Sequence, residues 1–163
     1  MPASFSTRYR FEDFINDLDA YMKANLAGYI SQMNTDKTDI TLLSPESTAY
    51  YFQTLADTEV PYKIFVFYGE KGIQTQHNGP EERNEYTIQV GILLENGNEL
   101  QGVMGKRLMR YRDCLKAMFN DGWNSMSKRV KLRVSGLSPF PFSLIKNEFT
   151  HIGIGVDLEV DFS

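Results

Sequence analysis

The sequence predicts one α+β domain, in which an antiparallel or mixed four-stranded sheet packs on two long helices in the order α-β-β-α-β-β. Two long stretches repeat apolar residues every three or four positions, as amphipathic helices do. Four other stretches have a period of two, which is typical of strands. The length of 163 residues and the apolar fraction of 42% fit a single domain, residues 1–163, with one core.

The first helix is predicted from Tyr9 to Met33. Its apolar stripe consists of Phe11, Phe14, Ile15, Leu18, Met22, Leu26, Tyr29 and Ile30. Most of the remaining positions are charged or carry amides. We therefore expect this helix to pack one face on the sheet.

The segment that follows, residues 34–61, begins with a loop. Ser44 precedes Pro45, which places an N-cap residue before a proline at the first helical position. This pattern predicts a short helix over residues 45–55. A short strand over Ile40–Leu43 could precede it.

The first two strands are predicted at Tyr62–Tyr68 and Tyr86–Leu94. Between them lies a polar segment of 17 residues, 69–85, which we expect to be a long loop. Loops longer than about 12–15 residues without secondary structure are usually functional or disordered. Two interpretations remain open: a mobile insertion without function, or an arm that becomes ordered on a partner during assembly.

The first of these strands is apolar on both faces. Phe65 and Phe67 lie on the face opposite Ile64 and Val66. A strand with two apolar faces must be covered on both, and the two helices cover one of them. The second cover is either the segment 135–150 of the same chain or another subunit, in which case this face marks an interface.

The second helix is predicted over Leu100–Phe119, with Asp121 and Gly122 ending it. Apolar residues recur there at steps of four and three, and the remaining positions are rich in basic residues. These are Lys106, Arg107, Arg110, Arg112 and Lys116. They form either a solvated face or a contact with an acidic patch on a partner.

The last two strands are predicted at Val130–Val134 and His151–Phe162, joined by a structured loop that contains two prolines. Their polar faces carry opposite charges, so we expect the two strands to pair antiparallel. The basic side would then lie opposite the acidic side on a solvated surface. The residues concerned are Arg129, Lys131 and Arg133 on one strand and Asp157, Glu159 and Asp161 on the other.

The sequence predicts no catalytic, cofactor-binding or metal site, and hence no enzyme. It contains no nucleophile elbow, phosphate-binding loop or zinc-protease motif. The two histidines, His77 and His151, have no cysteine or histidine at metal-ligand spacing. The acidic pairs lie in the polar 69–85 segment, where burial is not expected to shift a pKa.

Charge and composition narrow the classes of partner. The net charge of −4 weighs against a dedicated nucleic-acid-binding protein. No apolar run approaches the roughly 20 residues needed to cross a bilayer. With one cysteine, Cys114, no disulfide can form within the chain, which fits a reducing cytosol.

The order of elements, the chain length and the alternating last strand resemble the tail-terminator and related neck or tail-completion proteins of tailed bacteriophages. The resemblance covers nearly the whole chain and includes the polar segment between the first two strands. It implies a small α+β subunit that forms a ring, typically a hexamer, which caps the tail tube and offers a docking surface to the head.

We therefore expect a structural virion protein, assembled in the host cytoplasm, with no cofactor and no membrane contact. Its expected partners are copies of itself, the tail tube protein and head-completion or neck proteins, with nucleic acid present only as DNA passing through the ring. The alternatives are a head-completion or connector protein of the neck and a small nucleic-acid-binding domain. The candidate interface residues are Phe65, Phe67, Lys71, His77, Glu81, Glu82, Arg83, Arg107 and Arg110.

Overall fold

In the computed structural model, the described residues are 11–52, 62–78, 81–95, 100–126, 130–142 and 151–162. Side chains are described at residues 11–52, 62–70, 86–95, 100, 102–123 and 152–160. The elements follow one another as α1 (Phe11–Asp36), β1 (Tyr50–Phe52), β2 (Ile64–Asn78), β3 (Glu81–Glu95), α2 (Gln101–Met126), β4 (Val130–Phe142) and β5 (His151–Phe162).

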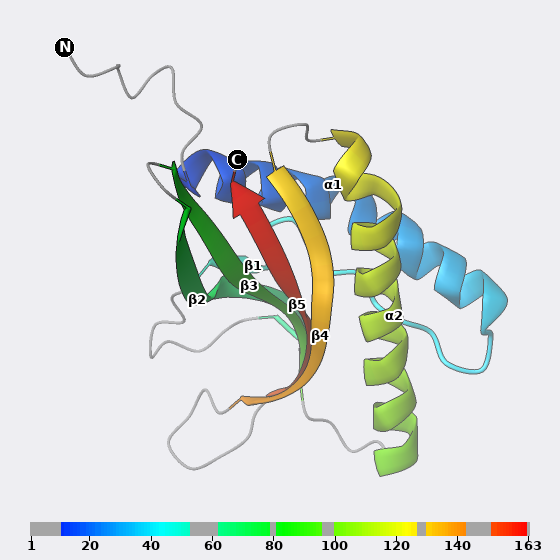
Figure 1. The fold of residues 1–163 in the computed structure, drawn as a ribbon. Coiled ribbons are helices and arrows are strands. Elements are labelled where there is room, and N and C mark those ends of the chain that lie inside the picture. The colour runs from blue at the N-terminus through cyan, green and yellow to red at the C-terminus, as the bar shows by residue number, and fades with distance from the viewer. Residues whose placement is uncertain are drawn as a thin grey trace.

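The strands form one mixed sheet in the order β1-β2-β3-β5-β4 (Figure 1). β1 runs parallel to β2, and all other neighbours are antiparallel. Both helices contribute to the same core cluster and lie on the same side of the sheet, crossing each other at a steep angle (Figure 1). The predicted α+β class, with a mixed sheet and two long helices, is confirmed, while the short strand β1 adds a fifth strand.

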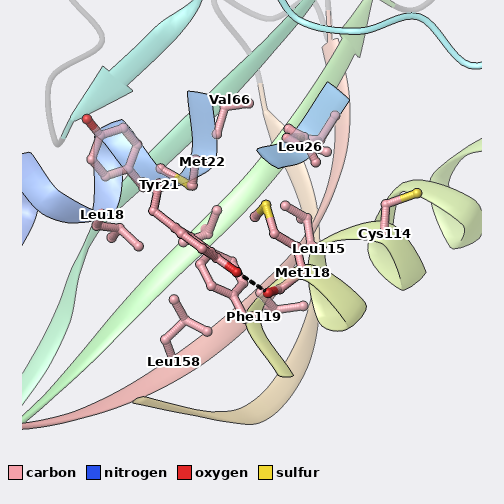
Figure 2. Packing of buried hydrophobic residues seen from close by; sticks show 14 of the residues in the cluster. Leu18, Tyr21, Met22, Leu26, Val66, Cys114, Leu115, Met118, Phe119 and Leu158 are labelled. Carbon is pink, nitrogen blue, oxygen red and sulfur yellow. Dashed lines mark hydrogen bonds between the residues drawn. The ribbon is translucent and has the colours of Figure 1, made fainter. Parts of the chain in front are cut away.

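The core lies between the helices and this face of the sheet. Leu18, Met22 and Leu26 of α1 and Leu115 of α2 are fully buried there (Figure 2). The buried hydroxyl of Tyr21 donates a hydrogen bond to the carbonyl oxygen of Met118 at 2.5 Å, which ties α1 to α2. Packing and hydrogen bonds such as this one together fix the angle between the helices.

α2 does not end at Asp121 and Gly122 as predicted but continues to Met126. Gly122 has a packing role instead. A Cβ atom at this position would lie 2.3 Å from the Tyr21 hydroxyl oxygen, closer than any real contact. The glycine that resembles a helix stop is therefore the point at which Tyr21 reaches the surface of α2.

The short helix expected over residues 45–55 was also wrong where the structure describes it. Residues 46–48 make a turn, and Tyr50–Phe52 form β1 beside Val66–Tyr68; residues 53–55 lie outside the described part. Residues 40–43 are not a strand. The Asn34 side chain makes two hydrogen bonds to the Leu42 backbone: its Oδ1 accepts from the Leu42 amide at 2.7 Å, and its Nδ2 donates to the Leu42 carbonyl oxygen at 2.9 Å. Pairing with β2 overrides the helix signal at Pro45, because local propensity is a weak prior.

The expected loop over residues 69–85 is mostly strand. β2 and β3 remain in antiparallel register up to the pair Asn78–Glu81, with a bulge between Glu70 and Gly72. Likewise, β4 continues through the proline-containing segment to Phe142. Neither segment shows the apolar alternation from which a strand is predicted. Strand pairing satisfies the hydrogen-bonding groups of the backbone without requiring that alternation, so the sequence pattern predicts a loop where a strand forms.

Candidate interaction surfaces

The sequence-predicted interface residues fall into three separate places in the fold. Arg107 and Arg110 lie on α2, beside the start of β2 and the end of β3. Lys71, His77 and the stretch Glu81–Arg83 lie at the other end of the same two strands, where the register pairs His77 with Glu82. Phe65 and Phe67 lie between them, on the face of the sheet that the helices do not cover. This arrangement is not one site, so we treat each place as a separate surface.

The two arginines of α2 hold the segment that follows α1. An Nη atom of Arg110 lies 2.8 Å from an Asp39 carboxylate oxygen, and Lys106 lies 4.0 Å from the same side chain. The hydrogen bond from Arg110 is the main reason that the pKa of Asp39 is below its ordinary value. Only 14% of the Arg110 side chain is exposed.

Two further bonds attach the same segment to α2. Arg107 donates to the carbonyl oxygen of Thr41, and the Tyr111 hydroxyl donates to that of Leu43 at 2.7 Å. These contacts give the basic residues of α2 a structural role within the chain. They weigh against the alternative in which Arg107 and Arg110 are held ready for phosphate groups.

A surface hollow of about 370 Å³ lies beside these contacts. A second hollow, of about 460 Å³, adjoins the first turn of α2. Each hollow has one well-exposed apolar side chain in its lining: Leu43, which is 55% exposed, in the first and Leu100, which is 79% exposed, in the second. The first hollow is lined by Thr41, Leu43, Lys63, Ile64, Leu94, Glu95, Met104, Arg107 and Tyr111.

The titratable groups near the core are shifted away from neutral pH. Burial raises the pKa of Tyr21 and that of Tyr50 to about 12, and it raises that of Cys114 to about 11. The pKa of Tyr68 is also raised, by burial and by its 2.5 Å hydrogen bond to Asp19. Within the described residues, no group of three or more His, Cys, Asp or Glu side chains is arranged to hold a metal ion.

The second face of the sheet has its own small apolar cluster. Phe65 is fully buried with Ala49 and Leu93, and the Tyr51 ring meets the Phe65 ring edge-on at 5.5 Å. Phe67 is half-buried beside them. Of the two covers left open for this face, the one at Phe65 lies within the same chain, and β1 with its preceding residues, rather than the segment 135–150, supplies the part of it that the described residues show.

The last two strands pair antiparallel, as predicted, but the expected solvated surface is wrong at Asp157, which is buried. The register places Lys131 opposite Asp161 and Arg133 opposite Glu159, while Arg129 lies outside the described residues. Cross-strand neighbours of opposite charge reduce the attraction of the basic residues for a phosphate backbone. β4 also forms an edge of the sheet, a property that the sequence pattern does not indicate.

No protein-family model and no curated protein sequence matches this chain. Among the described residues, no helix is both long and apolar enough to span a membrane.

Proposed function

We propose that this protein is a structural virion subunit that assembles with copies of itself into a ring, which terminates the tail tube of a bacteriophage and joins it to the head. The order of the ring is expected to be six, by analogy with the family that the chain resembles. A head-completion or connector role in the neck is the alternative within the same class.

The observation that carries this proposal is the order of elements around a single sheet. A long helix, an extended antiparallel hairpin, a second long helix and a closing antiparallel pair follow one another, with β1 as an addition. The resemblance rests on this order. The buried Phe65 no longer supports self-association, so the hairpin and the sheet edges carry that part of the proposal instead.

Light scattering coupled to size-exclusion chromatography, at several protein concentrations, tests the proposal. We expect a discrete oligomer whose negative-stain images show rings, alone or after addition of a tail tube protein. A strict monomer under all these conditions would contradict it. Binding to DNA that falls steeply as salt rises would favour the nucleic-acid-binding alternative instead.

A further inference from the structure

The five-stranded sheet ends in β4 on one side, and on the other side in the three-residue β1 and, beyond β1, in the outer side of β2. Within the described part of the chain, β4 pairs only with β5, and β2 beyond Tyr68 pairs only with β3. β1 covers the outer side of β2 at Val66–Tyr68. Long edges of unpaired backbone are templates for pairing with another chain, so each edge is a candidate contact with another chain.

Two backbone hydrogen bonds establish which way the amides of β2 and β3 point. The Glu95 amide donates to the Lys63 carbonyl at 2.7 Å, and the Val66 amide donates outward to the Ala49 carbonyl at 2.8 Å. Amide directions alternate along a strand. The amides of the odd-numbered residues of β3 therefore point toward β2, and the amides of its even-numbered residues point toward β5.

The same alternation shows that the prolines of β4 face outward. Ile92 and Ile154 are partners, and the Ile92 amide points toward β5, so these two residues exchange hydrogen bonds. The Ile154 amide therefore points away from β4. Pro139 is the partner of Ile154 on β4, so the backbone nitrogen of Pro139 faces away from β5. Pro141 has the same parity. Because proline has no amide proton, this half of the β4 edge offers no donors at these two positions.

The half of β4 that the prolines close is level with the half of β2 that β1 covers. Following the register across the sheet, one row contains Tyr50, Val66, Ile92, Ile154 and Pro139. The proline-free half is level with the part of β2 that β1 leaves open, since another row contains Ile73, Tyr86, Val160 and Leu132. By the same alternation, the amides of Leu132 and Ile73 both point outward.

The two edge strands also change course at the same level. β2 has its bulge between Glu70 and Gly72, and β4 has its bulge between Val134 and Gly136. Glu70 and Val134 share one row, through Ile88 and Leu158. Bulges bend and twist a strand, and Figure 1 shows β4 curving along its length. The matching positions divide both edges at one height.

The directions of the two edge strands also allow them to pair. Along the order β2-β3-β5-β4 each neighbour is antiparallel, so β2 and β4 of one chain run in opposite directions. If copies stand side by side with the same orientation, β4 of one copy meets β2 of the next in an antiparallel pair. Contacts of this head-to-tail kind generate closed rings when the rotation closes.

We infer that Val130–Val134 of one copy pairs antiparallel with Glu70–Thr75 of the next copy, so that the sheet continues from subunit to subunit. This inference rests on the proposed self-assembly into a ring, and it names the surface that makes the ring. Leu132 and Ile73 form the central hydrogen-bonded pair, and Lys131 lies opposite Gln74 as a closer, non-hydrogen-bonded pair.

A pair of proline substitutions in the full chain tests the inference. Leu132→Pro removes an outward donor and no hydrogen bond to β5, so we expect it to abolish the oligomer while circular dichroism stays unchanged. Leu137→Pro is the matched control. Its amide also points outward, but its row contains Tyr68 and Phe52, where β1 already closes the edge of β2, so the oligomer should persist.

A cross-linking experiment keeps the inference testable if Leu132→Pro fails to fold. In the double variant Lys131→Cys and Gln74→Cys, the two cysteines of one chain are three strand spacings apart, about 14 Å, too far for a disulfide within the chain. Mild oxidation should give a ladder of covalent multimers on a non-reducing gel. The double variant Pro139→Cys and Gln74→Cys, whose cysteines lie at different heights, and each single variant beside the native Cys114 should give no ladder.

The outcomes separate this inference from the proposed function. Edge pairing is supported by a ladder that the Lys131→Cys and Gln74→Cys double variant gives and its controls do not. It is also supported by loss of the oligomer in Leu132→Pro but not in Leu137→Pro. An oligomer that survives Leu132→Pro and gives no ladder overturns edge pairing and leaves the ring proposal intact. A wild-type chain that is monomeric at every concentration overturns the proposed function, and this inference with it.

Discussion

The two halves of the β2–β3 pair are built from the same two strands but are stabilised in different ways. Near Ile64–Tyr68, side chains are buried on both faces, under the helices on one side and beside Ala49 and Leu93 on the other. From Gly69 to Asn78, β2 is mostly polar; as far as Thr75 it lies in a part of the sheet that also contains β3, β5 and β4, and only its last three residues pair with a part of β3 that has no further neighbour among the described strands. Side-chain packing stabilises the first half, and backbone pairing stabilises the second. Mutations should therefore be costly in the first half and mild in the second.

Phe65→Ala should have the largest effect. Removing a fully buried phenylalanine leaves a cavity, and we expect a loss of about 3–5 kcal/mol in the free energy of unfolding. Thr75→Ala, in the polar half of β2, should change it by less than about 0.5 kcal/mol. Urea denaturation followed by tryptophan fluorescence measures both. Similar losses for the two variants would show that the halves are not distinct.

Gly122→Ala should also destabilise the region beneath the helices. The new methyl group would meet the Tyr21 hydroxyl, whose ring is held against Phe119 and Trp123. We expect a loss of about 1–2 kcal/mol from overpacking, which outweighs the gain in helix propensity.

The matched control for Gly122→Ala is Gly105→Ala in the same helix. A Cβ atom there would meet nothing within 4 Å, so this variant should gain about 0.5–1 kcal/mol. Opposite signs for the two glycines, read from the urea midpoints, would assign the effect to the Tyr21 contact. A gain at both positions would contradict it.

Tyr21→Phe should cost about 1 kcal/mol at pH 8, because it removes the hydrogen bond to Met118. The cost should shrink as the pH rises. The pKa of Tyr21 is raised to about 12 in the folded protein, so its stabilising contribution is complete below about pH 10 and is lost as the pH rises through 12. Urea midpoints at pH 8 and pH 11 would show the gap narrowing, and a constant gap would contradict the assignment.

Arg110→Ala should have the smallest effect of the four, since its partner Asp39 is at the surface. The pKa of Asp39 is lowered in the folded protein, so the contribution of the pair is present above the unfolded pKa and is lost as the pH falls through the folded one. The variant and the wild type should therefore differ in thermal midpoint at pH 7 and converge in acid. A difference that grows in acid would exclude this pair as its source.

The sequence pattern by itself determined the two long helices, the apolar parts of β2 and β3, and the antiparallel pairing of β4 with β5. The pairing of β4 with β5 was indicated by the opposite charges of their polar residues. In the two helices and in β2 and β3 the buried residues recur with the period of the element, so the signal is local. It also led to Arg107 and Arg110, although their partners, Asp39 and the Thr41 carbonyl, could not be read from it.

Tertiary structure alone decided the rest. β1 is a strand because β2 lies beside it, the polar half of β2 is a strand because its backbone is paired, and α2 passes Gly122 because Tyr21 needs the space. Each of these depends on a contact between residues that are distant along the chain, and such contacts leave no period in the sequence. The matching levels of Pro139 and β1 belong to the same class, since they emerge only once the strands are in register.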